Sequence, residues 1–332
     1  MLEPRRLGRT GLRVTPLGIG LAAIARPGYI TLGRAQDLPA ERTPDAMYAR
    51  VAAVLDAARA AGLRYVDVAR SYGHAEAFLA RWLAERGVTR GTLVAGSKWG
   101  YRYTAGWQVE AAVHEHKELS VERFTTQLRE SREVLGPWLD LYEIHSATVE
   151  SGCLEDERLL AALVAGRRRG DYRALGFTLS GITSARALEL GLAARVDGER
   201  VFDVVQATFN VLEPSLASGL RAAHDAGVGV IAKEVFANGR LTDANVRAAD
   251  AAILARLRAA MPGIPLDQAA VAFVLAHPFV DVALSGAATV EQLTSHVAAT
   301  RTPCPPTTLA ALAPLAEAPE RYWATRAELP WS

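Results

Sequence analysis

The sequence predicts an α/β fold, namely a (β/α)8 or TIM barrel with an N-terminal β-hairpin and long βα loops. Two observations lead to this prediction. Short apolar runs alternate with longer amphipathic stretches, which is the pattern of repeated βα units. The alternation occurs eight times in 332 residues, a length that single α/β barrels commonly have. We therefore expect eight parallel strands that close on themselves, each followed by a helix.

The hairpin comes first, because residues 6–14 place Gly8, Thr10 and Gly11 between apolar positions. Eight apolar runs are then expected to form the core strands: 15–20, 63–67, 92–97, 139–145, 174–178, 203–206, 228–232 and 280–284. The amphipathic stretches between them are expected to be helices: 45–61, 74–86, 121–135, 155–168, 184–192, 214–226, 266–276 and 289–299. Gly227 follows one of these stretches, where a left-handed residue often ends a helix.

An open, doubly wound sheet is the alternative architecture. Its fingerprint, G-x-G-x-x-G, should follow the first strand and bind a dinucleotide there. The chain has Gly18 and Gly20 at the first two positions but Ala23 where the third glycine is needed. The barrel is therefore preferred.

Three connections are longer than the usual few residues, and such loops tend to be functional in compact domains. They span residues 24–44, 100–119 and 233–250. We expect residues 1–332 to form a single (β/α)8 barrel domain, with residues 302–332 as a C-terminal tail that packs on it.

The composition excludes several classes of partner. Lys and Arg total 37 and Asp and Glu total 36, so the net charge of +1 provides no basic surface for nucleic acid. Cys153 and Cys304 do not have the spacing of a disulfide framework or a zinc site. No apolar stretch approaches the ~20 residues that span a bilayer, and the first residues lack a secretory signal. We expect a cytoplasmic protein with no membrane or nucleic-acid partner.

Four ionisable residues are expected at the C-terminal ends of strands two to four. Asp67 ends the second strand, Tyr72 lies in the loop behind it, and Lys98 and His145 end the next two strands. Adjacent strands lie about 5 Å apart, so that side chains from neighbouring ends can converge. In a parallel barrel this end is where chemistry is done.

These residue types suit proton transfer at a carbonyl or an alcohol. A tyrosine has a reference pKa near 10, and we expect the ammonium of Lys98 to lower the pKa of Tyr72, with Asp67 holding the lysine in place. A neutral imidazole can hold a carbonyl oxygen beside the phenol. None of the four supplies electrons, so a redox reaction requires a nicotinamide cofactor to carry the hydride.

Each of the four residues also has a structural interpretation when it is taken singly. Asp67 could cap a helix, Tyr72 could be a loop aromatic, Lys98 a solvated charge and His145 a core histidine. Their order along the chain, each at a strand's C-terminal end, favours a joint site.

The stretch from Asp67 through Tyr72 and Gly73 to Glu76 resembles the signature of the aldo-keto reductases. Further similarity covers about residues 5–300, including the N-terminal hairpin and the strand that leads to His145. The resemblance implies an NAD(P)H-dependent oxidoreductase that reversibly reduces aldehydes or ketones to alcohols. Tyr72 would be its general acid/base, in a catalytic set with Asp67, Lys98 and His145.

The resemblance also implies where the cofactor, NAD(P)H, is held. Gln206 and Phe209 resemble a segment in which a glutamine and an aromatic ring meet the nicotinamide. Gly286 and the residues after it resemble a segment that folds over the adenosine phosphates. The expected cofactor-binding residues are Gly20, Ser180, Gln206, Phe209, Phe236, Asn238, Arg240, Gly286, Thr289, Gln292 and His296.

Three positions depart from the family's pattern. Leu179 replaces an amide that usually holds the carboxamide of the nicotinamide. Glu234 stands where a serine is frequent, and we expect it to face the substrate or a cation such as Arg240. Ala288 stands where many NADP-preferring members place Arg or Lys, so the clamp for a 2′-phosphate is weakened. We therefore lean toward NAD or dual use.

Aromatic residues in the third βα connection suggest a substrate pocket. Trp99, Tyr101 and Trp107 are expected to line it, although they could as well brace their own loops. His114 and His116 have no third ligand evident in the sequence, so a polar patch is preferred and no metal site is predicted.

The expected partner is a small-molecule carbonyl compound or a sugar. Two other functions remain open. One is an NAD-dependent aldose or sugar dehydrogenase. The other is a nicotinamide-binding regulatory subunit that resembles channel-associated members of the family. The intact set of four residues and the absence of an evident docking tail count against the regulatory subunit.

Overall fold

Eight parallel strands close into a barrel in the computed structural model, which describes residues 2–332. Each predicted strand is present to within a few residues, and the predicted fold is confirmed. In barrel order the strands are β12 (Val204–Thr208), β13 (Gly229–Lys233), β14 (Val282–Ser285), β3 (Leu17–Gly20), β4 (Tyr65–Asp67), β5 (Val94–Trp99), β8 (Leu139–Ala147) and β9 (Ala174–Leu179).

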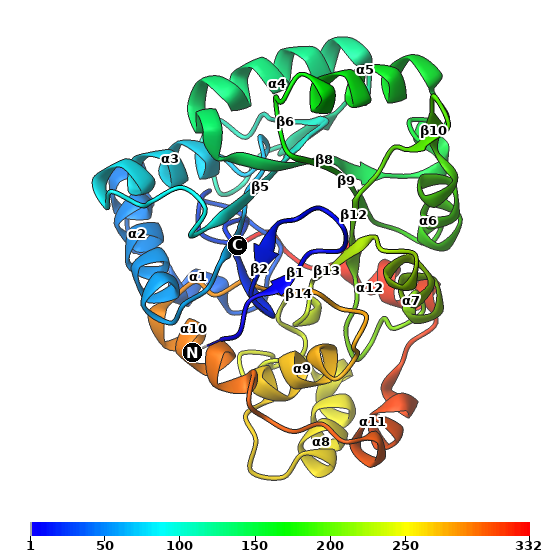
Figure 1. Cartoon of the computed structure of the whole chain (residues 1–332). Helices are drawn as coiled ribbons and strands as arrows, with labels where there is room; N and C mark the ends of the chain where they lie inside the picture. Colours follow the sequence, from blue (N-terminus) through cyan, green and yellow to red (C-terminus); the bar gives the residue numbers. More distant parts are fainter. Residues whose placement is uncertain (1) are drawn as a thin grey trace.

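The helices surround the barrel on its outer side (Figure 1). They are α2 (Pro44–Ala60), α3 (Ala75–Glu85), α4 (Val121–Leu135), α5 (Glu157–Arg168), α6 (Ser184–Ala193), α7 (Ala217–Asp225), α9 (Leu266–Leu275) and α10 (Val290–Ala299). Side chains of Thr43, Ser120, Asp156 and Thr289 cap the first turns of four of them, which satisfies backbone N–H groups that have no partner within the helix. Within residues 2–332, no helix is both long and apolar enough to cross a membrane.

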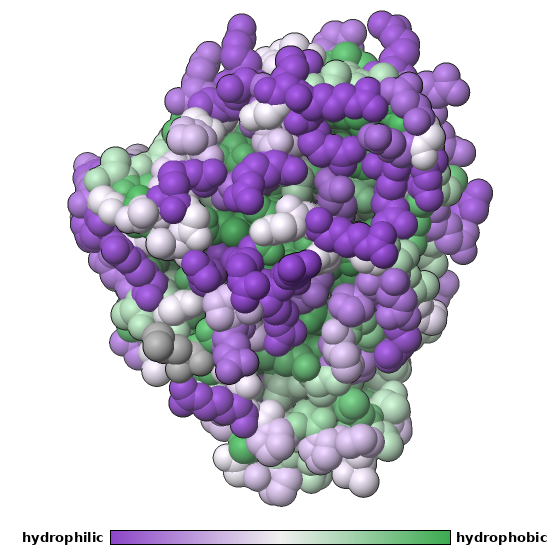
Figure 2. Space-filling model, in the orientation of Figure 1, coloured by the Kyte–Doolittle hydropathy of each residue, from purple (hydrophilic) through white to green (hydrophobic). Residues whose placement is uncertain are grey.

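The N-terminal hairpin, β1 (Arg5–Arg6) and β2 (Arg13–Val14), lies across one end of the barrel (Figure 1). Its side chains Leu7, Leu12 and Val14 join inward-facing residues of the strands, such as Tyr65 and Ile231, in one buried cluster. Seen from this end, many hydrophilic side chains cover the molecule, especially over α4 and α5 (Figure 2). The hairpin therefore closes the end opposite to the one where function is expected.

Glycines on neighbouring strands make room for large side chains inside the barrel. A Cβ atom on Gly96 would lie 2.3 Å from the hydroxyl of Tyr65, and one on Gly176 would lie 2.9 Å from Cγ of Glu143. Either alanine would collide with a side chain that other strands enclose. These two glycines thus allow Tyr65 and Glu143 to occupy the barrel interior.

The long connections contain more regular structure than the sequence indicated. Residues 100–119 form a hairpin of β6 (Tyr101–Tyr103) and β7 (Glu115–Lys117). The other additional elements are α1 (Arg34–Asp37), β10 (Arg195–Val196), β11 (Glu199–Arg200), η1 (Gly136–Trp138), η2 (Val149–Ser151), η3 (Ala237–Gly239), η4 (Ala248–Asp250) and α8 (Ala251–Ala260).

The last thirty residues contain α11 (Pro306–Leu312), η5 (Ala313–Leu315) and α12 (Pro319–Ala327), none of which we had predicted. After α12 the chain returns to the connection that follows β3. There Trp331 bridges to Ile30, and the backbones of Ser332 and Tyr29 exchange hydrogen bonds of 3.0 and 3.2 Å. The C-terminal residues therefore pack against the connection after β3 at the C-terminal end of the barrel.

A buried arginine joins this C-terminal segment to the connection after β13. The guanidinium of Arg240 donates to Asp250 at 2.7 Å and to Glu317 at 2.8 Å, and all three side chains are almost fully buried. Removing the cation would leave two carboxylates buried without it, which is strongly destabilising.

Replacement Arg240→Ala should therefore lower the free energy of unfolding by about 3–5 kcal/mol. Urea denaturation followed by circular dichroism measures it. The matched control is Arg258→Ala, which breaks an exposed pair with Asp243 and should cost less than about 1 kcal/mol. Equal losses in the two variants would contradict the anchoring role of Arg240.

Candidate active site

A cavity of about 300 Å³ opens at the C-terminal end of the barrel, opposite the N-terminal hairpin. Residues from the ends of all eight strands, or from the connections after them, contribute to this site. Ten residues expected from the sequence line the cavity: Gly20, Asp67, Tyr72, Tyr101, His145, Ser180, Gln206, Phe236, Asn238 and Gly286.

An ion pair between Lys98 and Asp67 lies at the base of the site. The ammonium donates to the Asp67 carboxylate and to the backbone oxygen of Val68 at 3.0 Å, and the two side chains are 0% and 3% exposed. The other carboxylate oxygen of Asp67 accepts from Gln206 at 2.9 Å and from Tyr65 at 3.2 Å. Asp67 is thus held from three strands, and it keeps a cation in the interior of the barrel.

Tyr72 and His145 lie together above this pair. The phenol oxygen is 3.4 Å from Nε2 of the imidazole, and the Lys98 ammonium is 5.1 Å from the centre of the phenol ring. Burial, followed by the charge of Lys98, holds the pKa of His145 well below its usual value. The imidazole is therefore neutral at pH 7, and it can donate one hydrogen bond beside the phenol.

The direction of the Tyr72 pKa shift differs from the expected one. Burial raises the pKa of Tyr72 well above 10, and the charge of Asp67 raises it further. The charge of Lys98 does not reverse this shift, because its ammonium donates to Asp67 and to the backbone of Val68. Tyr72 is therefore a firmly protonated phenol.

Glu143 is a second carboxyl group in the interior that sequence reasoning missed. Burial raises its pKa to about 8, with Lys98 lowering it and Asp67 raising it. The amide of Gln206 lies 3.3 Å from its Oε2 atom. Because side chains alternate along a strand, the position of Glu143 two residues before the inward-facing His145 could have indicated it.

The alternation of side chains along the strands makes two predictions wrong, namely the substrate contact of Trp99 and the cofactor contact of Phe209. Trp99 follows the inward-facing Lys98, so it points outward and is fully buried against Phe124, with ring centres 5.2 Å apart. Phe209 follows Thr208 and is fully buried among Phe273, His277 and Phe279. Neither residue lines the cavity, so Trp99 does not meet a substrate there and Phe209 does not offer its ring to a nicotinamide.

Five further predicted site residues also lie outside the cavity. Trp107 stacks on His74 at 4.3 Å between ring centres and bonds to the backbone of Arg42. Arg240 is engaged by Asp250 and Glu317, as described above.

The other three lie on α10 or at its N-cap and support the cavity wall from behind. Thr289 caps the helix, and Gln292 contacts the backbone of Ala288 and the side chain of Asp37, both at 2.8 Å. His296 stacks on Phe236, with ring centres 4.3 Å apart. Thr289, Gln292 and His296 are thus already engaged within the protein.

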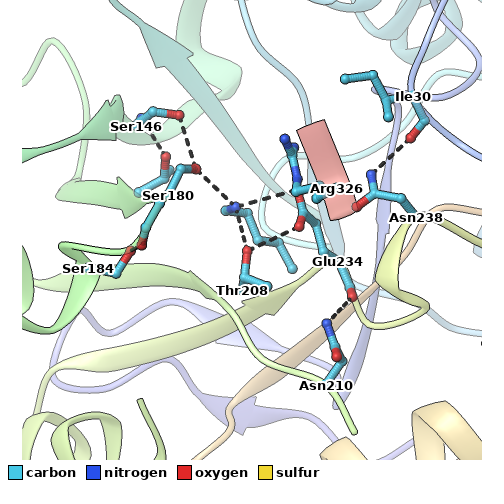
Figure 3. A network of polar contacts seen from close by, with 12 residues as sticks. Ile30, Ser146, Ser180, Ser184, Thr208, Asn210, Glu234, Asn238 and Arg326 are labelled. Carbon is cyan, nitrogen blue, oxygen red and sulfur yellow. Dashed lines mark hydrogen bonds and ion pairs between the residues drawn. The ribbon is translucent and has the colours of Figure 1, made fainter. Parts of the chain in front are cut away.

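A polar network on the far wall of the cavity was not predicted (Figure 3). The Lys233 ammonium donates to Thr208 at 2.9 Å and to Ser180 at 3.3 Å, and Ser180 lies 3.3 Å from Ser146. Burial lowers the pKa of Lys233 to about 8, although Glu234 opposes the shift. Lys233 could have been found from the sequence, because it ends the seventh strand.

Glu234 pairs with Arg326 of α12 rather than with Arg240. Two guanidinium nitrogens donate to its Oε1 atom at 2.6 and 2.8 Å (Figure 3). Burial would raise the pKa of Glu234, but Arg326 and Lys233 outweigh this effect and lower it to about 2. No local sequence signal indicates Arg326, because it reaches the site from a helix ninety residues further along the chain.

Aromatic and charged residues from distant segments form the mouth of the cavity. Arg26 pairs with Glu115 of β7 and lies over the rings of Tyr72 and Tyr29, at 5.2 and 4.7 Å from their centres. Trp331 also lines the cavity, and its ring stacks on His114 at 3.8 Å. The C-terminal segment therefore forms part of the site.

Backbone strain concentrates around this cavity. Ser146, Glu234, Ala237 and Asn238 have φ values of 56°, 53°, 47° and 55°, in the left-handed region that residues other than glycine rarely adopt. Such strain persists where the surrounding structure enforces it, commonly at functional sites.

Asn238 also carries an unused acceptor. Its amide nitrogen donates to the backbone of Ile30 at 2.9 Å, whereas its buried Oδ1 atom has no hydrogen-bond partner. Because a buried polar atom without a partner is costly, this oxygen suits a ligand that brings a donor into the cavity.

Fold and site together define a barrel protein with a cavity lined by ionisable side chains at the C-terminal end of its strands. The model of the Aldo/keto reductase family matches residues 30–317, and the chain belongs to this family. Membership supports an oxidoreductase and implies NAD(P)H-linked carbonyl chemistry. A search among curated proteins finds no match.

Solved structures show the same fold at low sequence identity. The holo form of aldo-keto reductase AKR11C1 from Bacillus halodurans has a TM-score of 0.75 at 19% identity, over 96% of this chain and 97% of that one. Its apo form has a TM-score of 0.68 at 20% identity, over the same shares of the two chains. A Pseudomonas aeruginosa protein assigned to the aldo-keto reductases has a TM-score of 0.65 at 23% identity, over 90% and 93%.

The raised pKa of Glu143 predicts a dependence of stability on pH. The folded protein holds this proton up to about pH 8, whereas an unfolded chain releases it near pH 4.3. The stabilisation is thus complete below pH 4.3 and is lost as the pH rises to 8. Between pH 5 and 8.5, the wild type should lose about 2–4 kcal/mol of unfolding free energy relative to Glu143→Gln.

Chemical denaturation at both pH values measures this difference. The control Glu122→Gln, on the exposed face of α4, should follow the wild type at both pH values. A constant difference between wild type and Glu143→Gln would show that Glu143 does not titrate in this range.

Proposed function

We propose that the protein is an NAD(P)H-dependent reductase of aldehydes or ketones, with Tyr72 as its general acid. The observation that carries the proposal is the convergence of the Tyr72 phenol and the neutral His145 imidazole, 3.4 Å apart, on one cavity. A carbonyl oxygen placed between them would accept a hydrogen bond from each. His145 orients the carbonyl, and Tyr72 supplies the proton that the product alcohol requires.

The raised pKa of Tyr72 is compatible with this role. When a carbonyl carbon receives a hydride, its oxygen becomes an alkoxide, which is a much stronger base than a phenolate. The phenol therefore loses its proton to the developing alkoxide even though burial raises its pKa. Lys98, fixed by Asp67, lies 5.1 Å from the ring and stabilises the negative charge that Tyr72 acquires.

The cavity provides groups that suit a nicotinamide cofactor, which supplies the hydride when bound. Ser180 and Gln206 offer a hydroxyl and an amide near Tyr72 and His145, where a carboxamide can be held. Phe236, Gly286 and the free Oδ1 of Asn238 lie along the wall formed after β13 and β14. We propose that these five residues hold the cofactor.

The alternative functions are less well supported. Oxidation of an aldose needs Tyr72 as a phenolate, and the raised pKa of the phenol disfavours that state. A regulatory subunit has no need for a lysine, a phenol and an imidazole assembled around one cavity. We therefore propose an enzyme that acts chiefly in the direction of reduction on a small carbonyl compound.

The replacement Tyr72→Phe should lower kcat by about 10²–10⁴-fold, which is the usual contribution of a general acid. Cofactor affinity should stay nearly unchanged, because the ring remains. Initial rates on a panel of aldehydes and tryptophan-fluorescence titrations with NADH measure the two quantities. Tyr103→Phe, on the hairpin of β6 and β7 but outside the cavity lining, is the control and should keep most of the turnover. Retention of most activity by Tyr72→Phe would contradict the assignment.

The preference between NAD and NADP depends on the side chain at position 288, which is alanine. Its backbone N–H is bonded to Gln292, and a methyl side chain cannot bind the 2′-phosphate that distinguishes NADP from NAD. We propose NAD or dual use, so kcat/KM with NADH should equal or exceed kcat/KM with NADPH. Parallel assays at 340 nm with both cofactors decide it, and a hundredfold preference for NADPH would exclude this proposal.

A further inference from the structure

Lys233 is a charged group in the cavity wall that the proposed mechanism does not use. It ends β13 and lines the same cavity as Tyr72 and His145. Within residues 2–332, its ammonium donates hydrogen bonds only to the uncharged hydroxyls of Thr208 and Ser180. Its side chain is 15% exposed, so water screens its charge only weakly.

The charges around the cavity balance except for Lys233. Within residues 2–332, Arg26 pairs with Glu115, Lys98 with Asp67 and Arg326 with Glu234. The carboxylate nearest to Lys233 is Glu234, at 3.9 Å, but the same oxygen accepts two shorter hydrogen bonds from Arg326. Glu143 is uncharged at neutral pH. When Lys98 beneath the cavity is counted as the partner of Asp67, the site has one surplus positive charge, and among the described residues Lys233 is the cation that lacks a carboxylate of its own.

This charge acts at the reacting centre. The field of Lys233 contributes to the lowered pKa of His145, after burial and the charge of Lys98. A hydride donor must come into contact with a carbonyl carbon whose oxygen lies at Tyr72 and His145. In a cavity of about 300 Å³, a nicotinamide ring at that place lies within reach of the Lys233 charge.

We propose that Lys233 makes the cavity discriminate between the redox states of the cofactor, binding the reduced nicotinamide more tightly than the oxidised one. The reduced ring is neutral, whereas the oxidised ring carries a positive charge that the surplus ammonium repels. This inference rests on the proposed function, and it makes Lys233 the residue that determines whether the reduced or the oxidised cofactor is retained. It also favours the release of the oxidised cofactor after reduction.

The test compares wild type, Lys233→Met and Lys233→Arg. Methionine keeps the length and apolar stem of lysine without its charge, and arginine keeps the charge. Dissociation constants for NADH and NAD⁺ are measured at pH 7 by isothermal titration calorimetry, after circular dichroism has verified folding. In Lys233→Met the ratio Kd(NAD⁺)/Kd(NADH) should fall about tenfold or more relative to wild type, and in Lys233→Arg it should stay within about threefold.

An unchanged ratio in Lys233→Met would overturn the proposal. If the ratio is unchanged and KM rises at least tenfold for carboxylate-bearing aldehydes but not for neutral ones, Lys233 is instead a receptor for a substrate anion. If wild type binds no nicotinamide in either redox state, including NADPH and NADP⁺, the proposed function itself fails, and this result is distinct from an unchanged ratio.

Discussion

A buried ammonium inside the barrel governs the arrangement of the site. Lys98 cannot remain charged in the interior without an anion beside it, and Asp67 from the neighbouring strand provides one. Three strands hold that carboxylate in place, through Lys98, Tyr65 and Gln206. Because one anion already balances the ammonium, the second carboxyl group, Glu143, keeps its proton and adds no charge. The interior is thus polar but electrically neutral beneath the cavity.

The alternation of side chains along parallel strands explains which parts of the site were predictable. Sequence pattern located all eight strands, and the position of Asp67, Lys98 and His145 at strand ends placed them together at one site. The same rule, applied residue by residue, would have excluded Trp99 and Phe209. Both follow an inward-facing residue and must point toward the helices.

Other features depend on tertiary contacts that no local pattern encodes. Arg326 and Trp331 reach the cavity from a C-terminal segment, which continues from α12 back to the connection after β3. The raised pKa of Tyr72 likewise could not be predicted, since it depends on how completely the phenol is buried and on which way the Lys98 ammonium points. Residue types indicated a proton-transfer centre, but only the geometry gave the direction of its pKa shift.

The proton on Tyr72 and the proposed effect of the Lys233 charge both favour carbonyl reduction, and they do so for independent reasons. The buried phenol of Tyr72 holds its proton firmly, which favours donation to a newly formed alkoxide over removal of a proton from an alcohol. Lys233 lies on the opposite wall, where Glu234 is already engaged by Arg326. On the proposal above, its charge repels the positive charge of the oxidised nicotinamide. If Lys233 acts as proposed, the two walls separately disfavour the phenolate and the oxidised nicotinamide, the two species that alcohol oxidation requires. On this proposal, the resting electrostatics of the cavity suit carbonyl reduction, whichever carbonyl compound it binds.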